Sequence, residues 1–236
     1  MTTDAPALTP ARYLDRIAAD GVEIGRLSRA HPDRIVPSCP DWTGTDLIGH
    51  LTAFTAWLRG VLLEPGGIAA PLPDVVDPGE AVRDWDSTLA GLLGLLRDVD
   101  PADPVPNWST GPQIAAFWVR RSAQDVSIHR WDAAHLESDE PAPVPADVAV
   151  DGLHEYLDVF VTTAFATGGA PENEATLALQ VADLGHTLHR DLPHPGPVTT
   201  LRGTASDLLL GLWHRVDPLE LTVDGDRDLV RAWPRI

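Results

Sequence analysis

Two segments of the sequence carry side chains that could hold a reactive metal ion. Asp125 and His129 lie four residues apart in a stretch with helical apolar spacing, so both would point from one face of a helix. His50 lies far upstream, in a second stretch with the pattern of a helix. Two imidazoles and one carboxylate, with a fourth position open, form the ligand set of a divalent metal site that does chemistry. These three residues are therefore candidate metal ligands.

Each candidate also has an interpretation that needs no metal. A single histidine on an apolar helix face usually hydrogen-bonds a backbone carbonyl, and the spacing D-x-x-x-H occurs in many helices by chance. Asp125 needs a partner, because its expected helix also buries apolar side chains and a desolvated carboxylate is costly. Arg121, four residues earlier, could be that partner. Spacing alone leaves a salt bridge and a metal site both open.

Helical segments are expected to position these side chains. Apolar periodicity and capping residues predict helices over about residues 10–30, 44–63, 80–99 and 112–135. The connections are rich in proline and glycine, and we expect loops at 64–79, at 100–108 and around Cys39. Four amphipathic helices with such connections predict an antiparallel four-helix bundle.

The pattern changes in the second half of the chain. An acidic, proline-rich stretch at 137–147 is typical of a linker. A helix is expected over 148–165, followed by short strand-like and helical segments that include a hairpin turn at Leu184-Gly185. We therefore predict the α+β class, with a four-helix bundle over residues 1–140 and a small α/β domain over residues 141–236.

Composition and charge limit the kind of protein and its partners. The chain has 236 residues, 44% hydrophobic and 22% charged, which is enough to bury a core. A net charge of −18 repels nucleic-acid phosphates and anionic lipids, so we expect neither as a partner. The single cysteine excludes an intramolecular disulfide and favours a cytoplasmic location, and we expect no secretion signal and no membrane span. The choice between a monomer and a small homo-oligomer stays open.

Three blocks of the sequence form a recognisable set. The first block is CPDW at 39–42 followed by DLIGHL at 46–51, and the second is AQD at 123–125 followed by HRWD at 129–132. The third block is RGTASDLLL at 202–210. Together these blocks resemble the mycothiol-dependent maleylpyruvate isomerase family. The resemblance covers nearly the whole chain. It implies a DinB-like four-helix bundle joined to a small C-terminal α/β domain.

The resemblance also implies a metal and a thiol cofactor. By position, His50, Asp125 and His129 are the metal ligands, with zinc expected, and mycothiol supplies the thiol. The implied reaction is addition of the metal-activated thiolate to a small electrophilic substrate, in an isomerisation or a thiol transfer. The family has glutamate in place of Asp125 and histidine in place of Gln124. A member with a weakened metal site that only binds a ligand is therefore an alternative.

Further residues are candidates for binding the substrate. Arg202 could bind a substrate carboxylate or could be a surface arginine. Trp42 and Trp131 lie near the candidate ligands in the sequence and are expected to wall the site. Cys39 is expected to be a packed structural residue, because the reactive thiol of this family belongs to the cofactor. Two enzymatic alternatives stay open: a mycothiol S-transferase in detoxification or biosynthesis, and a metal hydrolase that needs no thiol.

Overall fold

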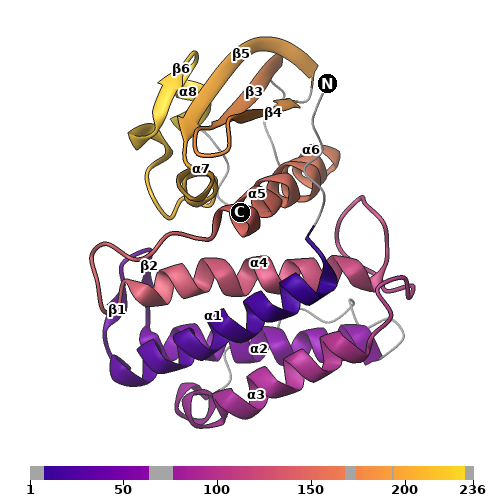
Figure 1. Ribbon diagram of the computed structural model, residues 1–236, viewed down its shortest axis with the longest axis vertical. Coiled ribbons are helices and arrows are strands. Elements are labelled where there is room, and N and C mark those ends of the chain that lie inside the picture. Colours follow the sequence, from indigo (N-terminus) through magenta and orange to yellow (C-terminus); the bar gives the residue numbers. More distant parts are fainter. Residues whose placement is uncertain (1–7, 64–76, 168–173, 193, 232–236) are drawn as a thin grey trace. The chain divides into compact units, whose positions relative to one another are not determined.

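The chain folds as an α+β protein of two compact units (Figure 1). The structure is a computed structural model and describes residues 8–63, 77–167, 174–192 and 194–231. A helical unit comprises Thr9–Trp108 and Pro112–Ala142, and the chain from Pro143 onward forms a unit of helices and a sheet. The predicted α+β class, with helices before a sheet-containing C-terminal part, is confirmed.

Four long helices make up the helical unit and lie side by side as a bundle (Figure 1). They are α1 (Pro10–Ala30), α2 (Gly44–Leu63), α3 (Pro78–Asp98) and α4 (Ala115–Ala134). The hydroxyl of Thr9 accepts a hydrogen bond from the backbone N–H of Arg12 and caps α1, as its position before Pro10 predicts. Asp77 caps α3, which therefore begins two residues before the predicted Glu80. Most of the loop predicted over 64–79 lies outside the described residues.

Apolar side chains from all four helices fill the centre of the bundle. Among the largest fully buried ones are Ile17, Ile24, Leu51, Leu58, Trp85, Leu92 and Trp118. Burying each such side chain stabilises the fold by about 1.5–3 kcal/mol. Gly21 lets α1 approach α3 closely, because a Cβ there would lie 2.5 Å from the side chain of Leu89. The indole N–H of Trp85 then reaches the Gly21 carbonyl at 2.8 Å. The buried side chains on α2 and α4, such as Leu51, Leu58 and Trp118, hold the two helices that carry the candidate ligands in the same core.

A short β-hairpin connects α1 to α2, and the prediction of an irregular loop around Cys39 is wrong. β1 (Ile35–Val36) pairs antiparallel with β2 (Cys39–Thr43). Strands this short and broken by proline give no alternating pattern in the sequence. The hairpin leads directly into α2 through a reciprocal cap: the backbone N–H of Thr43 donates to the carboxylate of Asp46, whose own N–H donates back to Thr43 Oγ1.

The second unit begins with a helical segment and continues into a sheet. α5 (Ala146–Glu155), the π-helical turn η2 (Tyr156–Val161) and α6 (Thr162–Ala166) occupy the stretch predicted as one helix. The sheet has the strand order β4-β3-β5-β6. Its strands are β3 (Glu174–Val181), β4 (His186–Asp191), β5 (His194–Gly203) and β6 (Thr222–Asp224). The remaining elements are α7 (Ala205–Leu212), the 3-10 turn η3 (Pro218–Glu220) and α8 (Arg227–Arg231).

The sheet combines a predicted hairpin with a parallel pair. β3 and β4 pair antiparallel around Gly185, whose φ of 68° suits glycine at the turn that the sequence indicates. β3 also pairs with β5 in parallel, with Gln180 opposite Arg202. This register places Arg202 on the strand that ends just before α7.

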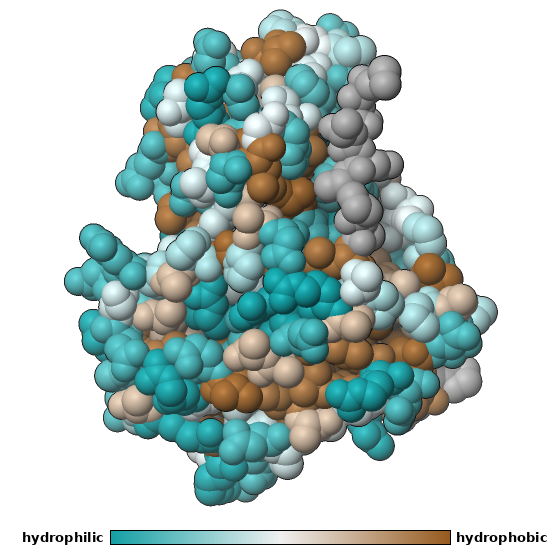
Figure 2. Space-filling model, in the orientation of Figure 1, coloured by the Kyte–Doolittle hydropathy of each residue, from teal (hydrophilic) through white to brown (hydrophobic). Residues whose placement is uncertain are grey.

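Polar and charged side chains cover most of the visible surface, with smaller apolar patches between them (Figure 2). The large apolar side chains that are exposed are Val22, Ile35, Leu63, Trp108, Leu184 and Val198. Among the described residues, none of the helices combines the length and the apolar character that crossing a bilayer requires.

An ion-pair cluster on the helical unit makes a pH-dependent contribution to stability. Arg26 on α1 contacts Glu23 at 2.8 Å and Glu137 at 2.9 Å. Hydrogen bonds from the Arg26 guanidinium lower the pKa of both carboxyls from the usual 4.5. Groups with a lowered folded-state pKa stabilise the fold above the unfolded value, and this contribution is lost as the pH falls through the folded-state pKa.

We therefore expect Arg26→Gln to lower the thermal unfolding midpoint slightly at pH 7, because exposed ion pairs contribute little. The difference from the unchanged protein should shrink as the pH is lowered from 7 towards 2.5, where the carboxyls are protonated. Thermal unfolding followed by circular dichroism, for both proteins across this pH range, measures the difference in midpoint. A difference that is the same at every pH would contradict the assignment.

Candidate metal centre

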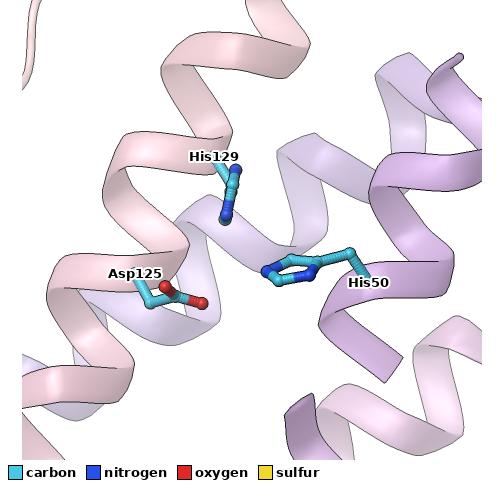
Figure 3. A group of neighbouring side chains, drawn as sticks. All are labelled: His50, Asp125 and His129. Carbon is cyan, nitrogen blue, oxygen red and sulfur yellow. The ribbon is translucent and has the colours of Figure 1, made fainter. Parts of the chain in front are cut away.

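His50 on α2 and the pair Asp125 and His129 on α4 come together inside the helical unit (Figure 3). Asp125 and His129 project from successive turns of one helix face, and His50 points toward them from the neighbouring helix. One potential ligand atom from each side chain lies within 4.8 Å of the others. In the part of the chain that the structure describes, no other group of three His, Cys, Asp or Glu side chains has this arrangement. The structure thus brings together all three residues predicted from the sequence.

The two oxygens of Asp125 have different surroundings. Oδ1 lies 3.6 Å from the guanidinium of Arg121, so the salt bridge that the sequence left open is present. Oδ2 is buried and has no hydrogen-bond partner among the described residues. Leaving a buried acceptor unsatisfied costs about 1–3 kcal/mol. A cation bound at the cluster would satisfy this oxygen, so the residues present fit a metal ion.

A buried carboxylate orients the ring of His129. Its Nδ1 lies 2.9 Å from Oδ2 of Asp132, which leaves Nε2 as the nitrogen for the cluster. The other carboxylate oxygen of Asp132 accepts a hydrogen bond of 2.5 Å from the hydroxyl of Ser38. Asp132 belongs to the HRWD block, but the sequence pattern alone assigned it no role. Its i+3 spacing from His129 was the available signal, since residues three apart are neighbours on a helix.

The aromatic ring of Trp42 covers both imidazoles. Its centroid lies 4.7 Å from that of His50 and 5.8 Å from that of His129, and the two imidazole centroids are 5.0 Å apart. Trp42 is on β2, so the hairpin packs against the cluster, and the expected role of Trp42 toward substrate stays a prediction. The ring of Trp131 instead packs edge-on against His135 at 4.1 Å. The expected contact of Trp131 with substrate stays a prediction.

Two further candidates have clear positions but no contact with a ligand to test their roles. Arg202 is exposed on β5, and its Nε donates a hydrogen bond of 2.8 Å to Oε1 of Gln180 on β3. Its binding of a substrate carboxylate stays a prediction. Cys39 is half-buried, with its sulfur 4.0 Å from Oδ2 of Asp132. That position in the hairpin suits a packed structural residue.

The second unit holds an open pocket of about 420 Å³ lined by Thr162, Phe165, His189, Arg190 and Asp191. Its arginine already pairs with Asp158 at 3.3 Å and with the hydroxyl of Thr162. The lining contains none of the candidate residues that the sequence indicates.

Comparison with known proteins identifies the family. The sequence model of the mycothiol maleylpyruvate isomerase N-terminal domain matches residues 11–134, and that of the MDMPI C-terminal domain matches residues 147–232. No curated protein matches the chain.

Two solved structures share the fold. A crystal structure of a mycothiol-dependent maleylpyruvate isomerase has a TM-score of 0.66, and one of a histidine-to-alanine mutant of such an isomerase has a TM-score of 0.69. Each is 13% identical over 97% of this chain and 98% of the other. The family predicted from the sequence blocks is confirmed, and with it, at the level of the family, the prediction of an enzyme. This chain belongs to the mycothiol maleylpyruvate isomerase family.

Proposed function

We propose that the chain is a mycothiol-dependent metalloenzyme that isomerises a small electrophilic substrate or transfers the thiol to it. The observation that carries this proposal is the convergence of His50, Asp125 and His129 within 4.8 Å. Three protein ligands leave a tetrahedral ion one position for a thiol, which distinguishes a catalytic site from a closed structural one. Membership of the family supports mycothiol as the source of that thiol.

The shorter side chain of Asp125 is compatible with this role. Ligand atoms of a tetrahedral zinc site lie about 3.4 Å apart, given bond lengths of about 2.1 Å. The Asp125 oxygen and both imidazoles already lie within 4.8 Å of one another, so small side-chain movements suffice. The replacement of glutamate by aspartate therefore does not by itself argue for a non-catalytic member.

The residues of the cluster set its charge. A divalent metal held by these residues, with zinc expected for the family, would supply the positive charge that keeps a coordinated thiol as thiolate near neutral pH. Asp125 contributes one negative charge and the two imidazoles contribute none, which leaves a net charge of about +1 that attracts an anionic sulfur. Arg121 holds the carboxylate through Oδ1. Trp42 packs over both imidazoles and limits their rotation.

We extend the proposal to partners and location. The chain would act on a small molecule in the cytoplasm, as a monomer or a small homo-oligomer. Its net charge of −18 supports the expectation that neither nucleic acid nor an anionic membrane is a partner. Arg202 would hold a substrate carboxylate.

Cobalt substitution with added mycothiol tests the proposal even while the substrate is unidentified. Addition of mycothiol to the cobalt-loaded protein should produce a sulfur-to-cobalt charge-transfer band in the near ultraviolet. His50→Ala should not give the band, whereas Asp84→Asn, which removes an exposed carboxylate on α3, should give it unchanged. Absence of the band in the cobalt-loaded protein would contradict thiol binding.

Turnover assays with maleylpyruvate and with an alkylating electrophile then separate the reactions. We expect activity with one of these substrates only when both zinc and mycothiol are present. Activity with zinc alone would indicate a metal hydrolase. Metal and thiol binding without any turnover of either class would favour a ligand-binding member.

A further inference from the structure

We infer that Asp132, held by Ser38, is a positioning residue that fixes the tautomer and orientation of His129 for metal binding. The inference rests on the proposed metal site, and it adds two residues that are not ligands. Both residues lie in the helical unit, Asp132 on α4 and Ser38 between the two strands of the hairpin.

The contact between His129 and Asp132 bears on which ring nitrogen of His129 carries the proton. A neutral imidazole carries one N–H and one lone pair, and only the nitrogen with the lone pair binds a metal. Nδ1 of His129 lies 2.9 Å from a carboxylate oxygen of Asp132, which accepts a hydrogen bond but cannot donate one when ionised. In this contact we expect the proton of the neutral ring on Nδ1 and the lone pair on Nε2. His129 is 5% exposed, so water competes little for this contact.

The carboxylate of Asp132 is itself held in place by its neighbours. Its side chain is 0% exposed, and its two oxygens have different partners. Oδ2 faces His129, while Oδ1 accepts a hydrogen bond of 2.5 Å from the Ser38 hydroxyl. Contacts on both oxygens fix the rotation of the carboxylate about its last bond. Ser38, which lies outside α4, thereby helps to set the orientation of the His129 imidazole.

The β1–β2 hairpin contacts the metal-ligand cluster at more than one point. The hairpin that carries Ser38 also carries Trp42, whose ring packs on His50 and His129. The hairpin thus acts on His129 in two ways. The Trp42 ring packs on the imidazole, and Ser38 holds Asp132 against Nδ1 of His129. A carboxylate that is hydrogen-bonded to the second nitrogen of a histidine ligand makes that imidazole a more basic ligand. A merely structural role for Asp132 would affect stability but would leave metal affinity unchanged.

Zinc competition with a chromophoric chelator tests this inference on folded full-length variants. We expect Asp132→Ala to weaken zinc binding about 10- to 100-fold, the usual effect of losing such a partner. Asp132→Asn should have a smaller effect, because its amide oxygen still accepts from Nδ1 but carries no charge. Ser38→Ala should also have a smaller effect. The control Asp84→Asn should bind zinc as the unchanged protein does.

Nitrogen-15 NMR of the metal-free proteins reads the tautomer directly. We expect His129 to carry its proton on Nδ1 in the unchanged protein and in Asp132→Asn, and to lose this preference in Asp132→Ala. If Asp132→Ala does not fold, zinc affinity is measured in Asp132→Asn and Ser38→Ala, since both substitutions preserve the packing closely.

The outcomes separate this inference from the proposed function. Full zinc affinity in the Asp132 variants, together with loss of zinc in His50→Ala, would overturn the positioning role and leave the metal site standing. Failure of the unchanged protein to bind zinc would overturn the metal site and the positioning role that depends on it. A proton on Nε2 of His129 in the metal-free protein would also overturn the inference.

Discussion

Replacing Asp125 with alanine is expected to weaken zinc binding by on the order of a hundredfold or more. Loss of an outer partner of a ligand typically costs 10- to 100-fold, and loss of a ligand itself should cost at least as much. The substitution removes the buried Oδ2 and the only negative charge among the three candidate ligands. It also removes the ion pair of 3.6 Å to Arg121, which leaves a second positive charge beside the ion. Competition with a chelator measures the change in affinity.

Two matched variants test the chemical cause of that loss. Asp125→Asn keeps the shape of the side chain and removes its charge, so it should also bind zinc poorly. Asp125→Glu restores the residue type expected for the family and should retain zinc. Affinity at the level of the unchanged protein in both Asp125→Ala and Asp125→Asn would rule out Asp125 as a ligand.

Replacing Asp20 with alanine is expected to have the largest effect on stability, a loss of about 3–5 kcal/mol in the free energy of unfolding. Asp20 on α1 is 1% exposed, accepts a hydrogen bond of 2.8 Å from Ser127, and lies 3.6 Å from Nε of Arg130. Arg16 also hydrogen-bonds its carboxylate, with Nε at 2.7 Å. Burial lowers the pKa of Arg130, so removal of Asp20 would leave a costly charge without its nearby anion. Urea unfolding measures the loss.

Smaller losses are expected from the partners of Asp20. Ser127→Ala removes one hydrogen bond, so it should cost about 1–3 kcal/mol. Arg16→Ala should cost less than Asp20→Ala, because the Arg16 side chain is 18% exposed and water can replace part of its contact. A loss below about 1 kcal/mol for Asp20→Ala would contradict the role of this network in joining α1 to α4.

Local chemistry made the helix boundaries predictable from the sequence. Thr9 before Pro10 predicts the start of α1, and the predicted second helix has the bounds that the structure shows for α2. Helical spacing likewise places Asp125 and His129 on one face. The approach of His50 could not be derived in this way, because it depends on how α2 packs against α4. The sequence offered His50 as a candidate, and only the resemblance to a family tied it to the other two residues.

Features that depend on distant contacts or on very short elements were not predicted. The hairpin before α2 has strands of two and five residues, too short for a periodic signal. The parallel pairing of β3 with β5 joins segments separated by β4, and no local pattern encodes it. The role of Asp132 depends on the direction of the His129 ring and on Ser38, which lies 94 residues away in the chain. Spacing within one helix makes Asp132 a neighbour of His129 but cannot reveal the contact with Ser38.

Zinc-edge X-ray absorption of the protein loaded with one equivalent of zinc is the most direct test of the convergence of these side chains on one ion. We expect two imidazole nitrogens and a carboxylate oxygen at about 2.0–2.2 Å from zinc, with a sulfur at about 2.3 Å appearing once mycothiol is added. Fewer than two imidazoles around the zinc, or the same set of ligands in His50→Ala, would contradict a metal site formed by His50, Asp125 and His129.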